Sequence, residues 1–249
     1  MQCILKRRYN ESVTPSIVSW QNGTDAEIAA MIQAADAGTI DLSDYWSVGD
    51  ERVVHLSAMQ SSDVFESGTE AQDVVWVLMN EGYAGTGNEG VHFVVGQKDC
   101  LAETGRINAT GTVAGSWEQY AMRSVLNTDY YNAIPSVLRS ALKTFVTYTG
   151  YSENDNLQSV NDKVALFAEK EVTGDKTFAS NAESVLSQIK YYETAANRIK
   201  NKGVSANTWW LRSPNYGYSA QYCGDINPQG TPYGIAANNY AGVAPFVCI

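Results

Sequence analysis

The segment that most restricts the fold of this chain follows Thr208, where the helical periodicity of the upstream sequence disappears. Two apolar runs, Trp209–Pro214 and Val243–Ile249, enclose a stretch that is dense in glycine, asparagine and tyrosine. Asp225 is the only charged residue between them. Because glycine and asparagine favour turns, and because no helical period is present, we expect loops and short strands here, with 243–249 as the closing strand.

This stretch also has the composition of an antibody binding loop. Tyrosine supplies a large, rigid contact area, while asparagine, serine and glycine supply adaptable hydrogen bonds. The alternative interpretation is an irregular connection between two strands, and composition alone does not separate the two. The predicted ligand-binding residues are Asn215, Tyr216, Tyr218, Ser219, Gln221, Tyr222, Asp225, Asn227, Gln229, Tyr233, Asn238, Asn239 and Tyr240.

Length, charge and hydropathy exclude several classes of protein. The 249 residues are 44% hydrophobic, which is enough to bury a sizeable core. The net charge of −10 argues against a nucleic-acid partner, and Lys6-Arg7-Arg8 is too short a basic cluster to change this. No apolar run approaches the roughly 18–20 residues of a membrane span, so no membrane insertion is expected. Residues 1–5 followed by Lys6 have the wrong order for a signal peptide.

The cysteines predict neither a metal site nor a disulfide framework. Cys3, Cys100, Cys223 and Cys248 form no C-x-x-C pair, and we interpret them as reduced core thiols. Cys223 and Cys248 are the pair that could form a bridge. We predict no metal and no cofactor.

The sequence also lacks the usual signs of catalysis. It contains two histidines, His55 and His92, and each lies in an apparent strand. No Walker loop, G-x-S-x-G elbow or H-E-x-x-H helix is present. An acidic chain produces carboxylate pairs such as Glu66 with Glu70 by chance. We therefore predict a binding protein without catalytic residues.

The first half of the chain predicts a helix followed by strands. Thr24-Asp25-Ala26-Glu27 is a capping box, and the apolar residues after it recur at helical spacing, so a helix is expected over about 25–37. Short apolar runs bounded by turn residues predict antiparallel strands at 52–56, 74–79 and 91–95.

The second half predicts helices, a long loop and one strand. Ser116-Trp117-Glu118-Gln119 is a second capping box, and a further helix is expected after Ile134-Pro135, reaching Phe145. Residues 148–163 are polar and predict a long loop. A strand is expected at 164–168 and a helix at about 182–201. We predict an arm or edge strand at 1–24 and one α+β domain over 25–249. Within this domain, residues of about 209–249 are expected to display the ligand-binding surface.

Several residues in the apolar runs are expected to be structural. Trp209 and Trp210 suit core packing, because each buries a large area. Arg212 is expected to donate to a carboxylate or to backbone carbonyls as a structural fork. Glu169-Lys170-Glu171 is expected to form a solvated turn with one ion pair.

The two apolar runs resemble the C-terminal signatures of a domain family of unknown function that is common in gut bacteria and their phages. These are Trp209-Trp210-Leu211-Arg212-Ser213-Pro214 and Gly242–Ile249. Weaker similarities to that family are Val48-Gly49-Asp50, Cys100-Leu101, Ser116-Trp117, Tyr131-Asn132-Ala133-Ile134-Pro135 and Glu169-Lys170-Glu171-Val172. The resemblance thus covers about 40–249.

The resemblance implies a C-type-lectin-like fold, similar to that of the variable proteins of diversity-generating retroelements. It implies a phage- or prophage-encoded attachment protein on a virion or a bacterial cell surface. The expected partner is a protein or glycan on a bacterial cell surface, and a homo-oligomer would add avidity. No calcium-binding lectin triplet is present, so calcium is not predicted.

Two alternatives remain open at this stage. A structural virion component, in the tail or as a head decoration, could use the same face as a subunit interface. The lectin-like scaffold also hosts formylglycine-generating-type oxidases, and these would need Cys223 and Cys248 for copper or thiol chemistry.

Overall fold

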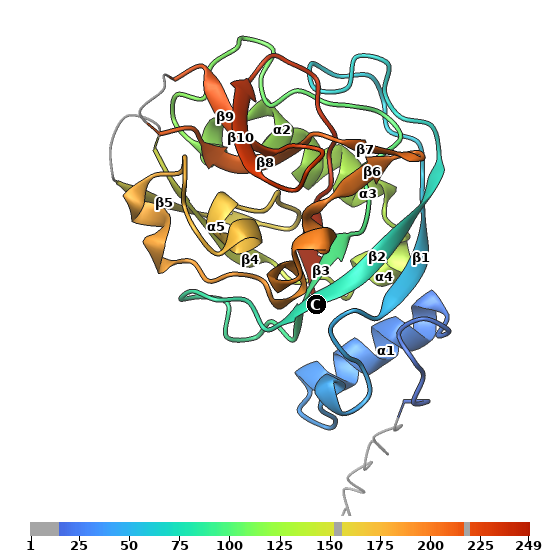
Figure 1. Cartoon of the computed structure of the whole chain (residues 1–249). Helices are drawn as coiled ribbons and strands as arrows, with labels where there is room; N and C mark the ends of the chain where they lie inside the picture. The colour runs from blue at the N-terminus through green and yellow to red at the C-terminus, as the bar shows by residue number, and fades with distance from the viewer. Residues whose placement is uncertain (1–14, 152–155, 217–219) are drawn as a thin grey trace, which may run out of the picture.

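The computed structural model describes residues 15–151, 156–216 and 220–249 and is an α+β structure with small antiparallel sheets, as predicted. A four-stranded sheet has the order β1-β2-β3-β11 (Figure 1). Its strands are β1 (Glu51–Leu56), β2 (Gln72–Glu81), β3 (Phe93–Gln97) and β11 (Phe246–Cys248). The expected strands at 52–56, 74–79 and 91–95 are therefore confirmed to within a few residues. The expected closing strand is β11.

A three-stranded sheet includes two strands of the predicted binding segment and lies at the top in Figure 1, with α2 behind it. Its order is β10-β9-β8, with β8 at Trp209–Pro214, β9 at Tyr222–Ile226 and β10 at Pro232–Ala236. Two further hairpins pair β4 with β5 and β6 with β7. They comprise β4 (Phe145–Gly150), β5 (Leu157–Asp162), β6 (Lys200–Lys202) and β7 (Ser205–Asn207).

The first helix, α1 (Asp25–Asp36), begins at the predicted capping box. Thr24 accepts a hydrogen bond from the Glu27 backbone, and the Glu27 carboxylate accepts one from the Thr24 backbone at 2.9 Å. The other helices are short: α2 (Ala121–Val125), α3 (Tyr131–Ala133), α4 (Ser136–Arg139) and α5 (Glu169–Thr173). A π-helical turn at 126–130 joins α2 to α3, and 3-10 turns lie at 42–44, 117–119, 181–185, 190–193 and 195–198.

The core joins the two larger sheets. Trp209 and Trp210 of β8 are fully buried, which confirms their predicted packing role. Phe246 of β11 stacks on Phe167 with ring centroids 4.4 Å apart, and Phe145 of β4 also packs on the Phe246 ring. The strand that ends the chain is thus tied by aromatic contacts to segments far away in the sequence.

Two of the expected helices are largely absent, and a third, over 117–133, is helical but begins without its predicted capping box. The second capping box does not form, because Ser116 has a positive φ of 61° and its hydroxyl donates to the carbonyl of Gly150 at 2.7 Å. The helix expected after Pro135 ends at Arg139, and Phe145 lies in β4. The segment 182–201 forms 3-10 turns and β6 instead of one helix, since its residues are held individually by neighbouring elements.

The loop expected at 148–163 and the strand expected at 164–168 are also corrected. Most of 148–163 forms the β4–β5 hairpin, in which each strand satisfies the backbone groups of the other. Residues 164–168 make only one bridge, from Ala165 to Phe246. The apolar side chains of 164–168 are buried in the core, and burial does not require that the segment pair as a strand.

The N-terminal segment forms no strand over 15–24, the described part of the predicted arm. Trp20 is buried there and packs edge-to-face on Trp46. Within the described ranges no helix is long and apolar enough to cross a membrane.

Candidate ligand-binding site

The base of the candidate site is a buried ion pair between β8 and α5. The Arg212 guanidinium donates to both carboxylate oxygens of Glu171, at 2.6 and 2.8 Å. It also donates to the carbonyls of Leu166 at 2.7 Å and Tyr148 at 3.1 Å. Tyr83 donates to the same carboxylate at 2.6 Å. The predicted structural fork is confirmed, and it joins β8 to α5 and β4.

The expected solvated turn at 169–171 is wrong, because Glu169 and Glu171 are each 1% exposed. The Glu169 carboxylate accepts hydrogen bonds from the backbone N–H groups of Thr177 at 2.6 Å, Phe178 at 3.0 Å and Ala179 at 2.7 Å. These donors offset much of the cost of burying the carboxyl group. Burial still raises its pKa above the ordinary value. Glu169 therefore fixes the turn at 177–179.

A third buried acid, Glu183, ties the end of β8 to β4. Its carboxyl group accepts from the Ser213 hydroxyl at 2.6 Å and from the Gly150 backbone at 3.0 Å. The Ser213 hydroxyl in turn accepts from the Glu169 backbone at 2.9 Å. Burial raises the pKa of Glu183 to about 7. The predicted binding segment thus starts from a strand end that is held on two sides.

Five of the predicted binding residues gather at one end of the three-stranded sheet: Tyr216, Gln221, Tyr222, Asn238 and Asn239. We call this end the sheet tip. Hydrogen bonds bring its parts together, from Asn215 N–H to the Tyr222 carbonyl at 3.0 Å and from Ala237 N–H to the Gln221 carbonyl at 2.9 Å. Gln221 and both asparagines are exposed, and the two tyrosines are half-buried.

Asn215 and Asp225, which were predicted to face a ligand, lie inside the protein with exposures of 3% and 0%. The Asn215 amide packs where a side chain at Gly234 would otherwise lie. Asp225 is paired in register between Trp210 and Tyr233, and neither of its carboxylate oxygens has a hydrogen-bond partner. Burial raises the pKa of Asp225 to about 7. Asn215 follows the end of β8, and Asp225 lies in a run of four buried residues of β9, so tertiary packing encloses both side chains, and composition carries no signal of it.

Asn227 and Gln229 lie at the other end of the β9–β10 hairpin. The Asn227 side-chain oxygen accepts from the backbones of Gln229 at 2.9 Å and Thr231 at 3.1 Å, so it builds the turn. Five residues of β9 separate this turn from the sheet tip, a length of about 17 Å. These two residues therefore do not join the sheet tip.

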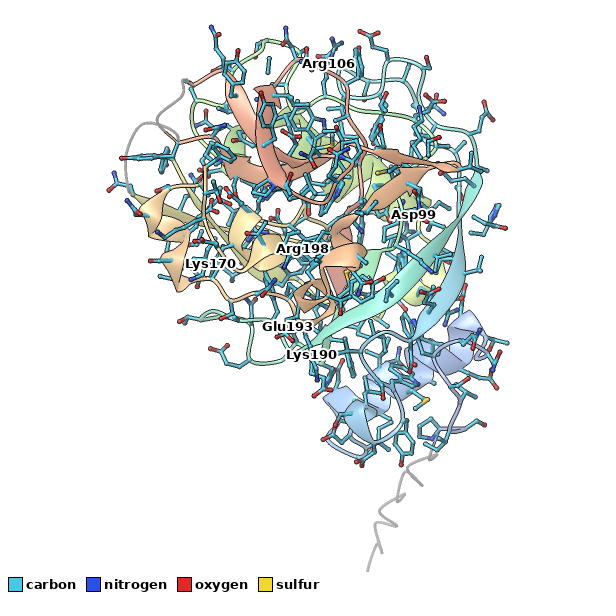
Figure 2. The ribbon with its side chains drawn as sticks, viewed as in Figure 1. Asp99, Arg106, Lys170, Lys190, Glu193 and Arg198 are labelled. Carbon is cyan, nitrogen blue, oxygen red and sulfur yellow. The ribbon has the colours of Figure 1, made fainter. Side chains whose placement is uncertain are left out.

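The two most exposed tyrosines among the described residues of the segment lie outside the sheet tip. Tyr233 is 58% exposed, and its ring packs edge-to-face with Phe178 at 6.5 Å. Tyr240 is 43% exposed and lies under the Arg106 guanidinium, 5.2 Å from its ring centre. Arg106 marks the upper edge of the molecule in Figure 2. Tyr218 and Ser219 lie outside the described residues.

Phe178 is a contributor that sequence reasoning missed. Its carbonyl accepts from the Tyr216 backbone at 2.7 Å, and its half-buried ring contacts Tyr233. It comes from the turn that Glu169 fixes. The available signal was an isolated aromatic residue in the polar stretch 173–182.

The described cysteines are free, buried thiols, and no bridge joins Cys223 to Cys248. Burial raises the pKa of Cys100 to about 12 and raises those of Cys223 and Cys248 above their usual range. Among the residues the structure describes, no group of three His, Cys, Asp or Glu side chains could hold a metal ion.

A family described as a domain of unknown function, DUF6273, matches residues 75–249, which is well over half of the chain. The chain belongs to this family. The DUF6273 match begins inside β2, so α1, β1 and the Val48-Gly49-Asp50 motif lie outside it, whereas the sheet tip and its buried base lie within. No curated protein and no solved structure matches the chain.

Proposed function

We propose that this DUF6273 protein is a ligand-binding attachment protein and that the sheet tip is its contact surface. The observation that carries the proposal is the grouping of uncharged tyrosine, glutamine and asparagine side chains at one end of a sheet whose base is a buried ion-pair network. Such side chains bind through shape and hydrogen bonding, and a fixed base lowers the entropy lost on binding.

We further propose that the scaffold is C-type-lectin-like and that the protein is a phage- or prophage-encoded variable protein of a diversity-generating retroelement. In support, the two apolar signatures form the buried strands β8 and β11, whereas the segment between them includes the exposed sheet tip. That division suits a frame that is kept while its display segment changes. Its partner would be a protein or glycan on a bacterial cell surface.

Sequencing the genomic locus tests the retroelement proposal. We expect a near-copy of the codons for about 209–249 that differs mainly at adenines, next to a reverse transcriptase gene. The absence of both from the complete locus would refute this part while leaving the binding proposal standing.

A cell-binding assay tests the contact surface directly. Fluorescently labelled protein is titrated onto a panel of bacterial strains, and Tyr216→Ala and Tyr222→Ala are each expected to weaken binding to the strains that the wild type binds roughly tenfold or more. Tyr45→Ala is the matched control, since Tyr45 is 42% exposed and lies outside the sheet tip. Equal binding by all variants would show that the ligand contacts another surface.

A structural virion component is the second candidate, and the exposed rings of Tyr233 and Tyr240, which lie outside the sheet tip, favour it. Such a protein would self-associate through this face and ignore cells. Sedimentation velocity separates the two candidates. A structural component would form an assembly that Tyr233→Ala reduces, whereas an attachment protein would keep its cell binding in that variant. The oxidase alternative requires reactive thiols, which burial disfavours at Cys223 and Cys248.

A further inference from the structure

A cavity of about 480 Å³ lies away from the sheet tip, between the loop at 47–49, the end of β2 and the 3-10 turns at 190–197. This volume falls within the ~300–1,000 Å³ range of small-molecule sites. Glu81 and Lys190–Asn197 belong to the DUF6273 match, whereas Ser47–Gly49 precedes it. The cavity therefore lies at the seam between the family domain and the segment before it.

Backbone hydrogen bonds hold the walls of this cavity in place. Gly49 donates to the Leu78 carbonyl of β2 at 2.8 Å, which fixes the first wall. Lys190 N–H donates to the Asn80 side chain at 3.0 Å, which fixes the second wall to the same strand. Asn197 donates to the Tyr191 carbonyl at 2.8 Å across the turns. A cavity whose walls are anchored in this way needs little reorganisation to accept a ligand.

The rim of the cavity carries charges of both signs that do not pair with each other. Lys190, Glu81 and Glu193 line it, all three are exposed, and none forms an ion pair with another described residue. Figure 2 shows Lys190 and Glu193 close together and far from Arg106. The half-buried Tyr191 and Asn197 complete the wall with an aromatic ring and an amide.

We propose that this cavity binds a small zwitterion carrying both an ammonium and a carboxylate group, the class of free amino acids and short peptides. Lys190 would bind the carboxylate, and Glu81 with Glu193 would bind the ammonium. A ligand with one charge only would meet the opposite charge on one side and a like charge on the other. A zwitterion complements both sides, and the amide of Asn197 adds a hydrogen bond.

Glycylglycine tests the proposal, with acetate and methylammonium as probes that carry one charge each. The protein is labelled with ¹⁵N and titrated while the amide resonances of Gly49, Tyr191 and Asn197 are followed. Saturable shifts are expected with the dipeptide, and at least tenfold weaker affinity is expected for either probe of single charge. Lys190→Gln and Glu193→Gln are each expected to lower the dipeptide affinity roughly tenfold, since each removes a charged hydrogen bond.

Matched controls use charges outside the cavity. Lys176→Gln, at a half-buried lysine, and Glu70→Gln, at an exposed glutamate, remove charges of the same types outside the cavity, and both variants are expected to bind glycylglycine as the wild type does. The proposal is overturned if no probe gives saturable shifts. It is equally overturned if acetate or methylammonium binds as tightly as the dipeptide, or if the cavity and control variants lose affinity alike.

Discussion

The Glu183→Gln substitution tests whether the buried acid beneath the sheet tip is protonated in the folded protein. Glu183 is fully buried, and burial is the main reason that its pKa rises from an ordinary 4.5 to about 7. The positive charge of Arg212 opposes this rise in pKa, but that guanidinium already donates two hydrogen bonds to the Glu171 carboxylate. Glutamine keeps an oxygen for the Gly150 N–H and supplies a neutral donor toward Ser213.

The expected magnitude follows from the difference between the folded and unfolded pKa values. Each pKa unit corresponds to about 1.4 kcal/mol, so Glu183 contributes about 3 kcal/mol that is present below about pH 4.5. This contribution falls as the pH rises between about 4.5 and 7, because the unfolded chain loses its proton first. At about pH 8 the wild type has lost it, whereas the glutamine variant never had a proton to lose.

Urea unfolding of both proteins at about pH 4.5, 6 and 8 measures the effect. The free energy of unfolding of Glu183→Gln relative to the wild type should rise by about 3 kcal/mol from the lowest to the highest pH. Comparing the two proteins at each pH cancels the other ionisable groups. A constant difference at all three values would mean that Glu183 stays ionised in the folded state and that the field of Arg212 outweighs burial.

Two further substitutions probe the same interior. Arg212→Met leaves the buried Glu171 carboxylate without its partner and should lower the free energy of unfolding by about 3–5 kcal/mol, against less than about 1 kcal/mol for the partly exposed Arg139→Met. Chemical denaturation that gave equal losses would contradict the ion-pair assignment. Asp225→Asn removes an unpartnered acid whose pKa burial raises to about 7, so it should stabilise the protein at about pH 8 by up to about 4 kcal/mol and much less at about pH 4. Thermal unfolding at the two pH values checks this, and a loss of stability at the higher pH would show that Asp225 has a favourable partner.

Local sequence predicted the elements whose stabilising contacts are themselves local. The helix α1 begins at its capping box because Thr24 and Glu27 satisfy each other's backbone donors within one turn. The β1 strand was predictable from the sequence because short apolar runs between turn residues favour strands. The packing of Trp209 and the fork of Arg212 were predictable because a large ring and a planar cation each have few stable places in an interior.

Tertiary contacts decided the elements whose partners lie far away along the chain. The β4 strand has β-branched and aromatic residues, but its polar partner β5 resembles a loop until the two pair. Residues 190–198 contain good helix formers, yet Asn80 and the Tyr192 packing hold them in 3-10 turns. Glu169 and Glu171 resemble surface residues until backbone donors and Arg212 enclose them.

For the candidate site, the sequence by itself determined which chemistry is available: aromatic and amide side chains, almost without charge. The tertiary structure alone decided which of those side chains reach the surface together. Packing of β8 and β9 against the rest of the protein enclosed Asn215 and Asp225, and the length of β9 placed Asn227 far from the sheet tip. Composition has no direction in space, whereas the pleat and register of a sheet assign each side chain to a face and an end.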